Sequence, residues 1–193
     1  TTFDPRWFLA AQELAETMIA HFQAPEGGFF DTSDDHEALI TRPRDLQDNA
    51  TPSGNAMAVT VLLKLAGFTN DLRYVDLAHH TLAEMQPMLA QYPLGFGQWL
   101  QALAYAFSKP REIAIVGDPE GADTQALLRI ARDGYRPYQV VALALSSSEL
   151  PAVPLLQDRG LVDGRAAAYV CRDFACQAPV MRPGALRHLL DRE

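Results

Sequence analysis

Acidic and amide side chains gather in a short segment that precedes a strongly apolar stretch. The segment DLQDNATPSGN covers residues 45–55 and places Asp48, Asn49 and Asn55 just before the apolar run 57–65. A carboxylate in this position can act as a general acid or base, and neighbouring amides can bind hydroxyl groups. The same residue types also cap helices and hydrogen-bond loop backbone. Both interpretations of Asp48, as the floor of a cleft and as a cap, are open from the sequence.

A second acidic stretch, DTSDDHE at residues 31–37, supplies further titratable groups. Glycoside hydrolysis uses two carboxyl groups, and epimerisation needs a general acid and a general base. Asp34, Asp35 and His36 are therefore candidate catalytic residues together with Asp48. A calcium loop is disfavoured because the ordered spacing and the glycine of an EF-hand are missing, so no metal site is expected. The alternative is that most of these acids are solvated surface.

Residues suited to holding a sugar surround these acids. Backbone amides at a helix N-terminus and small side chains would line the floor of a cleft, and aromatic rings would stack at its mouth. The candidate substrate-binding residues are Phe30, Asp31, Arg42, Asn49, Ser53, Asn55 and Gln98. A helix cap at Thr51 or Ser53 is the structural alternative for the polar residues of this segment.

Cys171 and Cys176 are separated by the sequence RDFA. This spacing differs from the two-residue separation found in thioredoxin and in most zinc knuckles, and there is no second cysteine pair. Two buried thiols and a reversible disulfide are both open. The pair is the candidate redox site.

Composition and charge narrow the class of protein. The 193 residues are 48% hydrophobic and 21% charged, as in soluble globular proteins. The net charge of −8 disfavours nonspecific binding to nucleic acid or to anionic membranes. Apolar runs stay well below the about 20 residues of a membrane span, and the N-terminus lacks a signal-peptide pattern, so a cytoplasmic location is expected. No cofactor is expected, because IVGDPEGADT at 115–124 lacks both the three-glycine fingerprint and the lysine of a P-loop.

Hydrophobic periodicity predicts a change of architecture near residue 109. Apolar residues at three- and four-residue spacings predict helices in the first part, whereas short β-branched runs predict strands in the second. The predicted helices lie at 5–22, 53–66, 71–89, 93–107, 123–132 and 183–190, and the predicted strands at 112–116, 139–145 and 167–171. We expect a mainly α chain, with an α/α-hairpin segment at 1–109 and a small βαβ-like α/β unit at 110–193.

Four motifs, taken in order, resemble a known family. They are GGFFD (27–31), DNATPSGN (48–55), IVGD (115–118) followed by Asp123-Thr124, and AYVCRDFACQAPV (168–180). The chain resembles the C-terminal part of the thioredoxin-domain-containing family that includes bacterial YyaL and the spermatogenesis-associated proteins of animals. The family usually has glycine where this chain has Asn49. The resemblance implies a thioredoxin-like domain followed by a six-hairpin, glycosidase-like α/α barrel, of which this chain would hold the last hairpins and the terminal α/β unit.

Two functions of different classes follow from the residues and the resemblance. The first is a carbohydrate-active protein, like an epimerase or a glycosidase, that binds a small carbohydrate in an acidic cleft at residues 30–55. The second is a non-catalytic binding or scaffold module that works with the thioredoxin-like domain in redox chemistry or partner recognition, through Cys171 and Cys176 or the terminal α/β unit. A degenerate barrel without activity is a third possibility.

Overall fold

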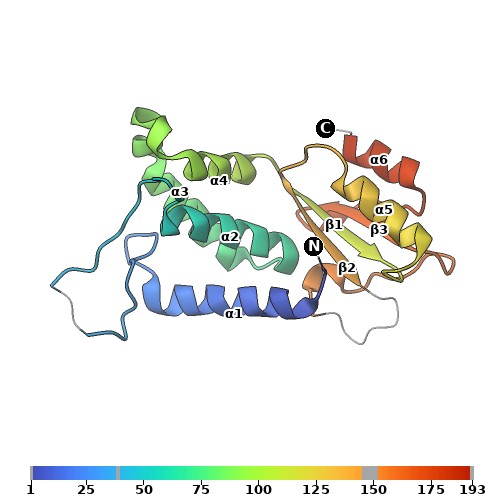
Figure 1. Ribbon diagram of the computed structural model, residues 1–193, viewed down its shortest axis with the longest axis horizontal. Coiled ribbons are helices and arrows are strands. Elements are labelled where there is room, and N and C mark those ends of the chain that lie inside the picture. The colour runs from blue at the N-terminus through green and yellow to red at the C-terminus, as the bar shows by residue number, and fades with distance from the viewer. Residues whose placement is uncertain (1, 38–39, 145–151, 192–193) are drawn as a thin grey trace. The chain divides into compact units, whose positions relative to one another are not determined.

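The computed structural model describes residues 2–37, 40–144 and 152–191 (Figure 1). The chain divides into two compact units, which are described one at a time. The helical unit consists of Phe8–Ala66 and Asp71–Ser108, and the sheet unit consists of Thr1–Trp7, Gly67–Asn70 and Lys109–Glu193. The expectation that 1–109 and 110–193 are separate domains stays a prediction.

The helical unit is built around one strongly apolar helix. Its elements come from α1 (Pro5–Phe22), α2 (Gly54–Thr69), α3 (Leu72–Gln91), the short 3-10 helix η1 (Pro93–Gly95) and α4 (Gly97–Phe107). Because α2 is apolar almost all the way round, it buries Val59 and Leu62 completely, in a core shared with Tyr74 and Trp99. The fourth predicted helix begins later than expected, because residues 93–95 form η1.

The sheet unit contains a four-stranded mixed sheet. Its strands are β1 (Arg111–Val116), β2 (Gln139–Ala144), β3 (Ala167–Arg172) and β4 (Ala175–Cys176), in the spatial order β2-β1-β3-β4. Strand β1 pairs with β2 in parallel, and helix α5 (Ala122–Arg132) connects them. The pairs β1–β3 and β3–β4 are antiparallel. Helix α6 (Pro183–Asp191) is the last described element.

Different parts of the chain cover the two faces of this sheet. Successive residues of β1 point to opposite faces, so Ile113 and Ile115 pack with α5 and α6, as through Leu127 and Leu186. Ala114 belongs to the second face, where it packs with residues of β2 and of the 3-10 helix η2 (Pro154–Leu156). The two helices lie on one side of the strands in Figure 1. Both faces of the central strand are therefore buried.

The expected fold class, a mainly α chain with a partial six-hairpin α/α barrel, is wrong. The described residues form an α/β arrangement of six α-helices and a mixed four-stranded sheet. The expected parallel strand pair with a connecting helix is present, but antiparallel strands extend it to a sheet with buried faces of its own. Amphipathic periodicity identifies helices that bury one side. It does not determine whether the partner is another helical hairpin or a few helices around a single core.

Among the described residues, none of the helices combines the length and the apolar composition needed to cross a membrane.

Candidate functional site

Buried side chains tie the segment between α1 and α2 to the helical unit. Asn55, in the first turn of α2, accepts a hydrogen bond from the Phe29 N–H at 2.7 Å and donates one to the Phe29 carbonyl at 2.8 Å. The Gly28 N–H donates to Thr81 Oγ1 of α3 at 3.1 Å. Asn55 exposes only 1% of its surface. The amide that the sequence assigns to a substrate hydroxyl is therefore bonded to backbone.

Asp48 joins the starts of two helices. Its Oδ1 accepts a hydrogen bond from the Ser53 N–H at 2.8 Å, immediately before α2. Its Oδ2 accepts one from the Gln98 N–H, in the first turn of α4, also at 2.8 Å. Both oxygens satisfy backbone donors at helix N-termini, where a negative charge is favoured. This geometry favours the capping interpretation of Asp48, and a catalytic role for this residue stays a prediction.

The side chains near Asp48 in the predicted site differ in their contacts and exposure. Ser53 caps α2, because its Oγ accepts from the Ala56 N–H at 3.2 Å, so Ser53 is the cap rather than Thr51. Gln98 donates from Nε2 to Thr60 Oγ1 at 2.9 Å. The side chain of Asn49 is exposed. These three predicted binding residues therefore lie in different environments.

The remaining predicted binding residues hold the acidic segment together. The Arg42 guanidinium lies over the Phe30 ring, 4.2 Å from its centroid, and donates to the His21 carbonyl at 2.9 Å. The Asp31 carboxylate accepts a hydrogen bond from the Asp45 N–H at 2.8 Å. Stacking and backbone bonds of this kind order a loop, because each satisfies a group that would otherwise need water.

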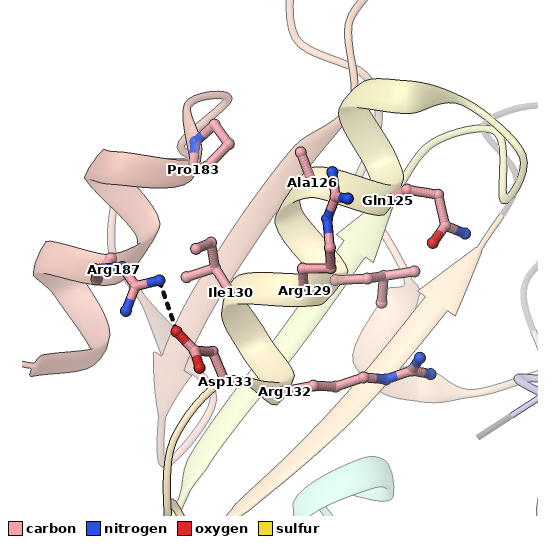
Figure 2. A pocket seen from close by; sticks show the side chains of 9 residues that line it. Gln125, Ala126, Arg129, Ile130, Arg132, Asp133, Pro183 and Arg187 are labelled. Atoms are coloured by element: carbon pink, nitrogen blue, oxygen red, sulfur yellow. Dashed lines mark ion pairs between the residues drawn. The ribbon is translucent and has the colours of Figure 1, made fainter.

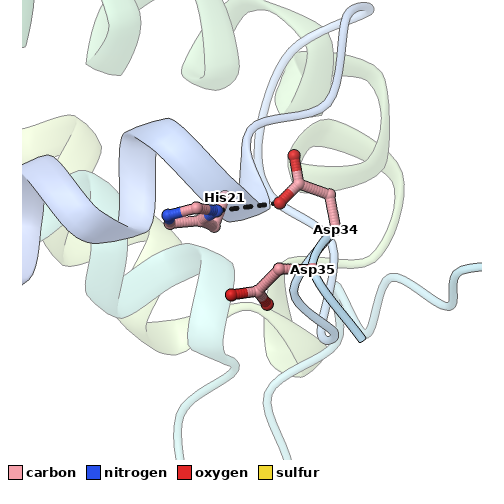
Figure 3. A group of neighbouring side chains, drawn as sticks. All are labelled: His21, Asp34 and Asp35. Carbon is pink, nitrogen blue, oxygen red and sulfur yellow. Dashed lines mark hydrogen bonds and ion pairs between the residues drawn. The ribbon is translucent and has the colours of Figure 1, made fainter. Parts of the chain in front are cut away.

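His21 lies beside Asp34 and Asp35, two of the predicted catalytic residues, although the sequence did not indicate it as a candidate. Its Nδ1 lies 2.8 Å from Asp34 Oδ1, and Asp35 stands beside it (Figure 3). The hydrogen bond to Asp34 raises the pKa of His21 above its ordinary value. A hydrogen bond from Ser33 lowers the pKa of Asp35. His36, a predicted catalytic residue, is exposed, and the histidine whose ring nitrogen contacts Asp34 is His21.

The cluster has the composition of a metal site, but it is open to solvent. One ligand atom from each of His21, Asp34 and Asp35 lies within 4.8 Å of the others. The side chains of His21 and Asp34 expose 42% and 53% of their surface. Exposed carboxylates are usually hydrated and need no ion. The expectation that no metal is bound stays a prediction.

A pocket of about 670 Å³ lies between α5 and α6, where the sequence predicted no site (Figure 2). Arg129 and Arg132 extend from α5 along it, and Arg187 of α6 forms an ion pair of 2.6 Å with Asp133. Arg187 lowers the pKa of the Asp133 carboxyl. The pairing offsets part of the positive charge of this pocket.

The candidate redox pair is a disulfide that joins two neighbouring strands. Cys171 on β3 and Cys176 on β4 are bonded to one another and face each other in the strand register, with 3.9 Å between their Cα atoms. Asp173 and Phe174, with φ of 51° and 58°, turn the chain between them. Positive φ at both central residues is typical of the tight hairpin turn whose twist matches its strands. Of the two states open from the sequence, the structure has the disulfide.

A guanidinium group lies against the two sulfur atoms. Arg159 Nη2 donates to Cys176 Sγ at 2.8 Å and lies 3.5 Å from Cys171 Sγ. Arg159 Nη1 donates to the carbonyls of Leu155 and Gln157, which hold the group in place. Burial lowers the pKa of Arg159, but arginine remains protonated at neutral pH. The disulfide therefore has a fixed positive charge beside it.

A buried acid lies near this charge. Glu112 of β1 exposes 6% of its surface, and its Oε2 accepts a hydrogen bond from the Phe174 N–H at 2.9 Å, within the hairpin turn. Burial raises the pKa of the Glu112 carboxyl above its ordinary value, and the charge of Arg159 acts in the opposite direction. Glu112 thus connects the centre of the sheet with the turn between the cysteines.

The exposed end of the disulfide opens into a pocket. Cys176 is exposed, whereas Cys171 exposes 1% of its surface. The pocket measures about 550 Å³, and Cys176 shares its wall with Arg159, Tyr169 and Phe174. A small thiol or the side chain of a partner protein can approach the disulfide from this side.

The sequence identified the two cysteines but not the charged residues that lie beside them and beside the turn that joins them. Arg159 lies twelve residues before Cys171 in a stretch without periodicity, and Glu112 belongs to a strand expected from its apolar residues. One signal was available, because a glutamate at the start of an apolar strand must find a partner when it is buried. His21 carried no comparable signal, since it ends a helix like many surface histidines.

Comparison with known proteins adds relatives but no function. No protein-family model matches the chain. The chain is similar to spermatogenesis-associated protein 20 from Homo sapiens and from Mus musculus, with 31% identity over 188 and 189 residues. The match covers 95% of this chain but 24% of each relative, so the chain spans about a quarter of their length. The resemblance to the spermatogenesis-associated proteins is confirmed, whereas the thioredoxin-like domain and the cytoplasmic location stay predictions.

Proposed function

We propose that the sheet unit carries a reversible dithiol–disulfide couple, formed by Cys171 and Cys176, that exchanges electrons with thiols of other molecules. The observation that carries the proposal is the contact of 2.8 Å between the Arg159 guanidinium and Cys176 Sγ. A thiolate is both the nucleophile and the leaving group of disulfide exchange, and a neighbouring cation stabilises it. The guanidinium therefore favours the reduced, ionised form of this pair.

The position of the disulfide supports exchange rather than a purely structural role. Cys176 is exposed and borders the pocket of about 550 Å³, so a second thiol has access to it. The cysteines are five positions apart in the sequence, so the bond closes a very short loop. In the chain-entropy account, a loop this short contributes only about 2 kcal/mol. Reduction is therefore compatible with a folded protein.

A thioredoxin-like domain is the partner that the sequence resemblance implies, and we propose it as one source of the exchanging thiol. Such a domain presents an exposed thiolate of lowered pKa, which suits attack on an accessible disulfide. Under this proposal the present chain is a redox-responsive binding module rather than an enzyme with a substrate pocket of its own.

The test is a redox titration of the whole chain. The protein is equilibrated with mixtures of reduced and oxidised glutathione, trapped with an alkylating agent, and its free thiols are counted by mass spectrometry. We expect a reversible two-electron transition in which both thiols appear together, at a potential above the about −300 mV typical of structural disulfides. A Cys171→Ser/Cys176→Ser variant provides the background. A pair that stays fully oxidised throughout, or that never reoxidises, would rule the function out.

A carbohydrate-directed activity at residues 30–55 has less support. Its favourable observation is the contact of His21 with Asp34, since a histidine and a carboxylate can share acid–base work. Against it, the Asp48 carboxylate and the Asn55 amide, the groups expected to bind or act on a sugar, already make hydrogen bonds with the backbone. If this activity exists, an Asp34→Asn variant will lose sugar turnover while its melting temperature stays close to that of the parent.

A further inference from the structure

Resting on the proposed function, we infer that the two sulfurs have different tasks: Cys176 forms the mixed disulfide with the incoming thiol, Cys171 is the resolving thiol, and Arg159 is a positioning residue that stabilises the Cys176 thiolate. The chemical class of the substrate is a thiol, either a small one such as glutathione or a cysteine of a protein. The assignment follows from access, charge and the balance of the exchange step.

Access separates the two sulfurs. An attacking thiolate must reach a sulfur along the direction of the bond that breaks, so the attacked atom needs an open side. Cys171 lies in β3, paired with β1 on one side and β4 on the other, and exposes 1% of its surface. Cys171 also borders a second pocket of about 370 Å³, but its small exposed fraction leaves little of it to attack. Cys176 lies on the edge strand and is exposed.

The exchange balances with two thiols as the reductant. A thiolate RS⁻ forms a bond to Cys176 Sγ, the bond between Cys176 and Cys171 breaks, and its electron pair leaves with Cys171 Sγ, which takes up a proton. A second thiolate attacks the outer sulfur of the mixed disulfide and forms RSSR, and the Cys176 thiolate leaves. Two thiols are oxidised and one disulfide is reduced. In the reverse direction, the Cys176 thiolate attacks a disulfide RSSR of the partner and RS⁻ leaves. The Cys171 thiolate then attacks Cys176 Sγ of the mixed disulfide, the Cys171–Cys176 bond forms again, and the second RS⁻ leaves.

Charge favours the same assignment in the direction in which the Cys176 thiolate is the attacking nucleophile. The Arg159 guanidinium lies 2.8 Å from Cys176 Sγ and 3.5 Å from Cys171 Sγ, so it stabilises a negative charge on Cys176 more strongly. Backbone carbonyls hold this group before reduction occurs, so little reorganisation is needed. Other charged or titratable groups face the same region, and they are unchanged in every variant tested below: Glu112, Asp158, Tyr169 and Asp173.

The first experiment traps the mixed disulfide. Cys171→Ser and Cys176→Ser variants of the whole chain are incubated with oxidised glutathione, and in parallel with a disulfide-linked cysteine peptide. The adduct is followed by intact mass over time. We expect Cys171→Ser, which keeps Cys176, to form an adduct at least tenfold faster than Cys176→Ser. Equal rates, or faster reaction of Cys176→Ser, would overturn the assignment. Reaction with the peptide alone would identify the substrate as a protein thiol rather than a small one.

The second experiment tests Arg159 by the pKa of Cys176. In the Cys171→Ser background, the alkylation rate of Cys176 is measured as a function of pH. The protein with Arg159 intact is compared with the variants Arg159→Gln and Arg159→Lys, and Arg165→Gln is the control at an exposed arginine. We expect Arg159→Gln to raise the pKa of Cys176, Arg159→Lys to restore part of the shift, and Arg165→Gln to leave it unchanged. Adduct formation at neutral pH should slow about threefold for each unit of pKa, because the nucleophilicity of the thiolate rises as its fraction falls.

An unchanged pKa in Arg159→Gln would contradict the role of this residue, and recovery by lysine separates lost charge from lost folding. Failure of the inference is distinct from failure of the proposed function. If the wild-type pair cycles with glutathione but the adduct forms on Cys171, only the assignment fails. If the wild-type pair does not cycle, the function fails, whichever cysteine reacts in the single variants.

Discussion

Asp48 connects two helices that are far apart in the sequence. One carboxylate accepts hydrogen bonds from the Ser53 and Gln98 N–H groups, and the Asp48 N–H donates to the Gly95 carbonyl at 3.0 Å. A helix cap contributes about 1 kcal/mol, and hydrogen bonds to charged groups contribute somewhat more. Stability is therefore the property that this residue affects most directly.

We expect Asp48→Ala to lower the free energy of unfolding by about 2–3 kcal/mol, because it leaves donors at two helix starts without an acceptor. Asp48→Asn should cost less, since its one amide oxygen still accepts. The neighbouring Asn49→Ala, at an exposed side chain, is the matched control and should change stability by less than about 0.5 kcal/mol. Urea denaturation gives the comparison. A stability of Asp48→Ala equal to that of the control would return Asp48 to the list of catalytic candidates.

His21 provides a pH-dependent measurement at the same scale. Its pKa is raised by the hydrogen bond with Asp34, so the protonated imidazole is favoured in the folded state. The resulting stabilisation is fully present below the ordinary histidine pKa of about 6.5, and it is lost as the pH rises through the higher folded-state value. Both side chains are partly exposed, so added salt weakens the effect.

Titration of the His21 ring protons by NMR should give a lower pKa in Asp34→Asn than in the parent protein. Asp45→Asn serves as the control, because the Asp45 carboxylate accepts from the Gln47 N–H instead. The free energy of unfolding should depend less on pH between about pH 6 and 8 in Asp34→Asn than in the parent protein. An unshifted His21 signal would mean that the contact with Asp34 does not persist in solution.

At the scale of elements, hydrogen bonds attach the described parts of the connection between α1 and α2, residues 23–37 and 40–53, to neighbouring helices. The isolated bridge between Gln23 and Phe29 reverses the chain directly after α1. The Trp99 Nε1–H group of α4 donates to the Leu46 carbonyl at 2.8 Å. A long irregular segment must find partners for its backbone groups, and here they come from helices α2, α3 and α4. Asn55, which exposes 1% of its surface, is one of the deeply buried partners.

We expect Asn55→Ala to destabilise the protein by about 2–4 kcal/mol, because the N–H and the carbonyl of Phe29 both lose their partner in a buried place. Hydrogen exchange of the Phe29 amide should accelerate before the core of α2 opens. Met57→Ala, in the same helix but at a 42% exposed side chain, controls for the change in the helix itself. Unchanged protection of Phe29 would show that its bonds with Asn55 contribute little.

The positions of most helices and strands along the chain could be predicted from the sequence, whereas the contacts between them could not. The helix expected at 5–22 and the strand expected at 112–116 correspond to α1 and β1. These predictions depend on residues close in sequence, because amphipathic spacing and caps act within a few turns. The prediction of a barrel was wrong because it depended on which helix faces pack against one another, and that is not a local property of the sequence. The capping role of Asp48 at α4 could not be predicted for the same reason, since the donor, the Gln98 N–H, is fifty residues away in the sequence.

At the scale of the whole molecule, the redox state of the disulfide is expected to change chemistry more than fold. The bond closes a short loop, and β3 pairs with β1 over five residue pairs from Glu112↔Cys171 to Val116↔Ala167. The core on one face of the sheet includes Ile113, Leu127 and Leu186 and does not include either cysteine. The reduced protein should therefore keep its sheet.

Reduction should lower the free energy of unfolding by no more than about 2 kcal/mol, because little chain entropy is released in a loop this short. Thermal unfolding with and without a phosphine reductant, which lacks a thiol, gives the measurement. The Cys171→Ser/Cys176→Ser variant should be insensitive to the reductant and close to the reduced protein in stability. Unfolding on reduction would show a structural disulfide and would argue against a reversible couple.

By itself, the sequence determined much of the local structure: where most helices and strands lie, which residues are apolar enough to be buried, and that four residues separate the two cysteines. Only the tertiary structure decided how these parts are used. It placed Arg159 on Cys176, Glu112 beneath the hairpin turn, His21 beside Asp34, and the carboxylate of Asp48 between two helix starts. The physical reason is range. Backbone preference and periodicity act between neighbours, whereas the charge and access that make a sulfur reactive come from residues brought together by folding.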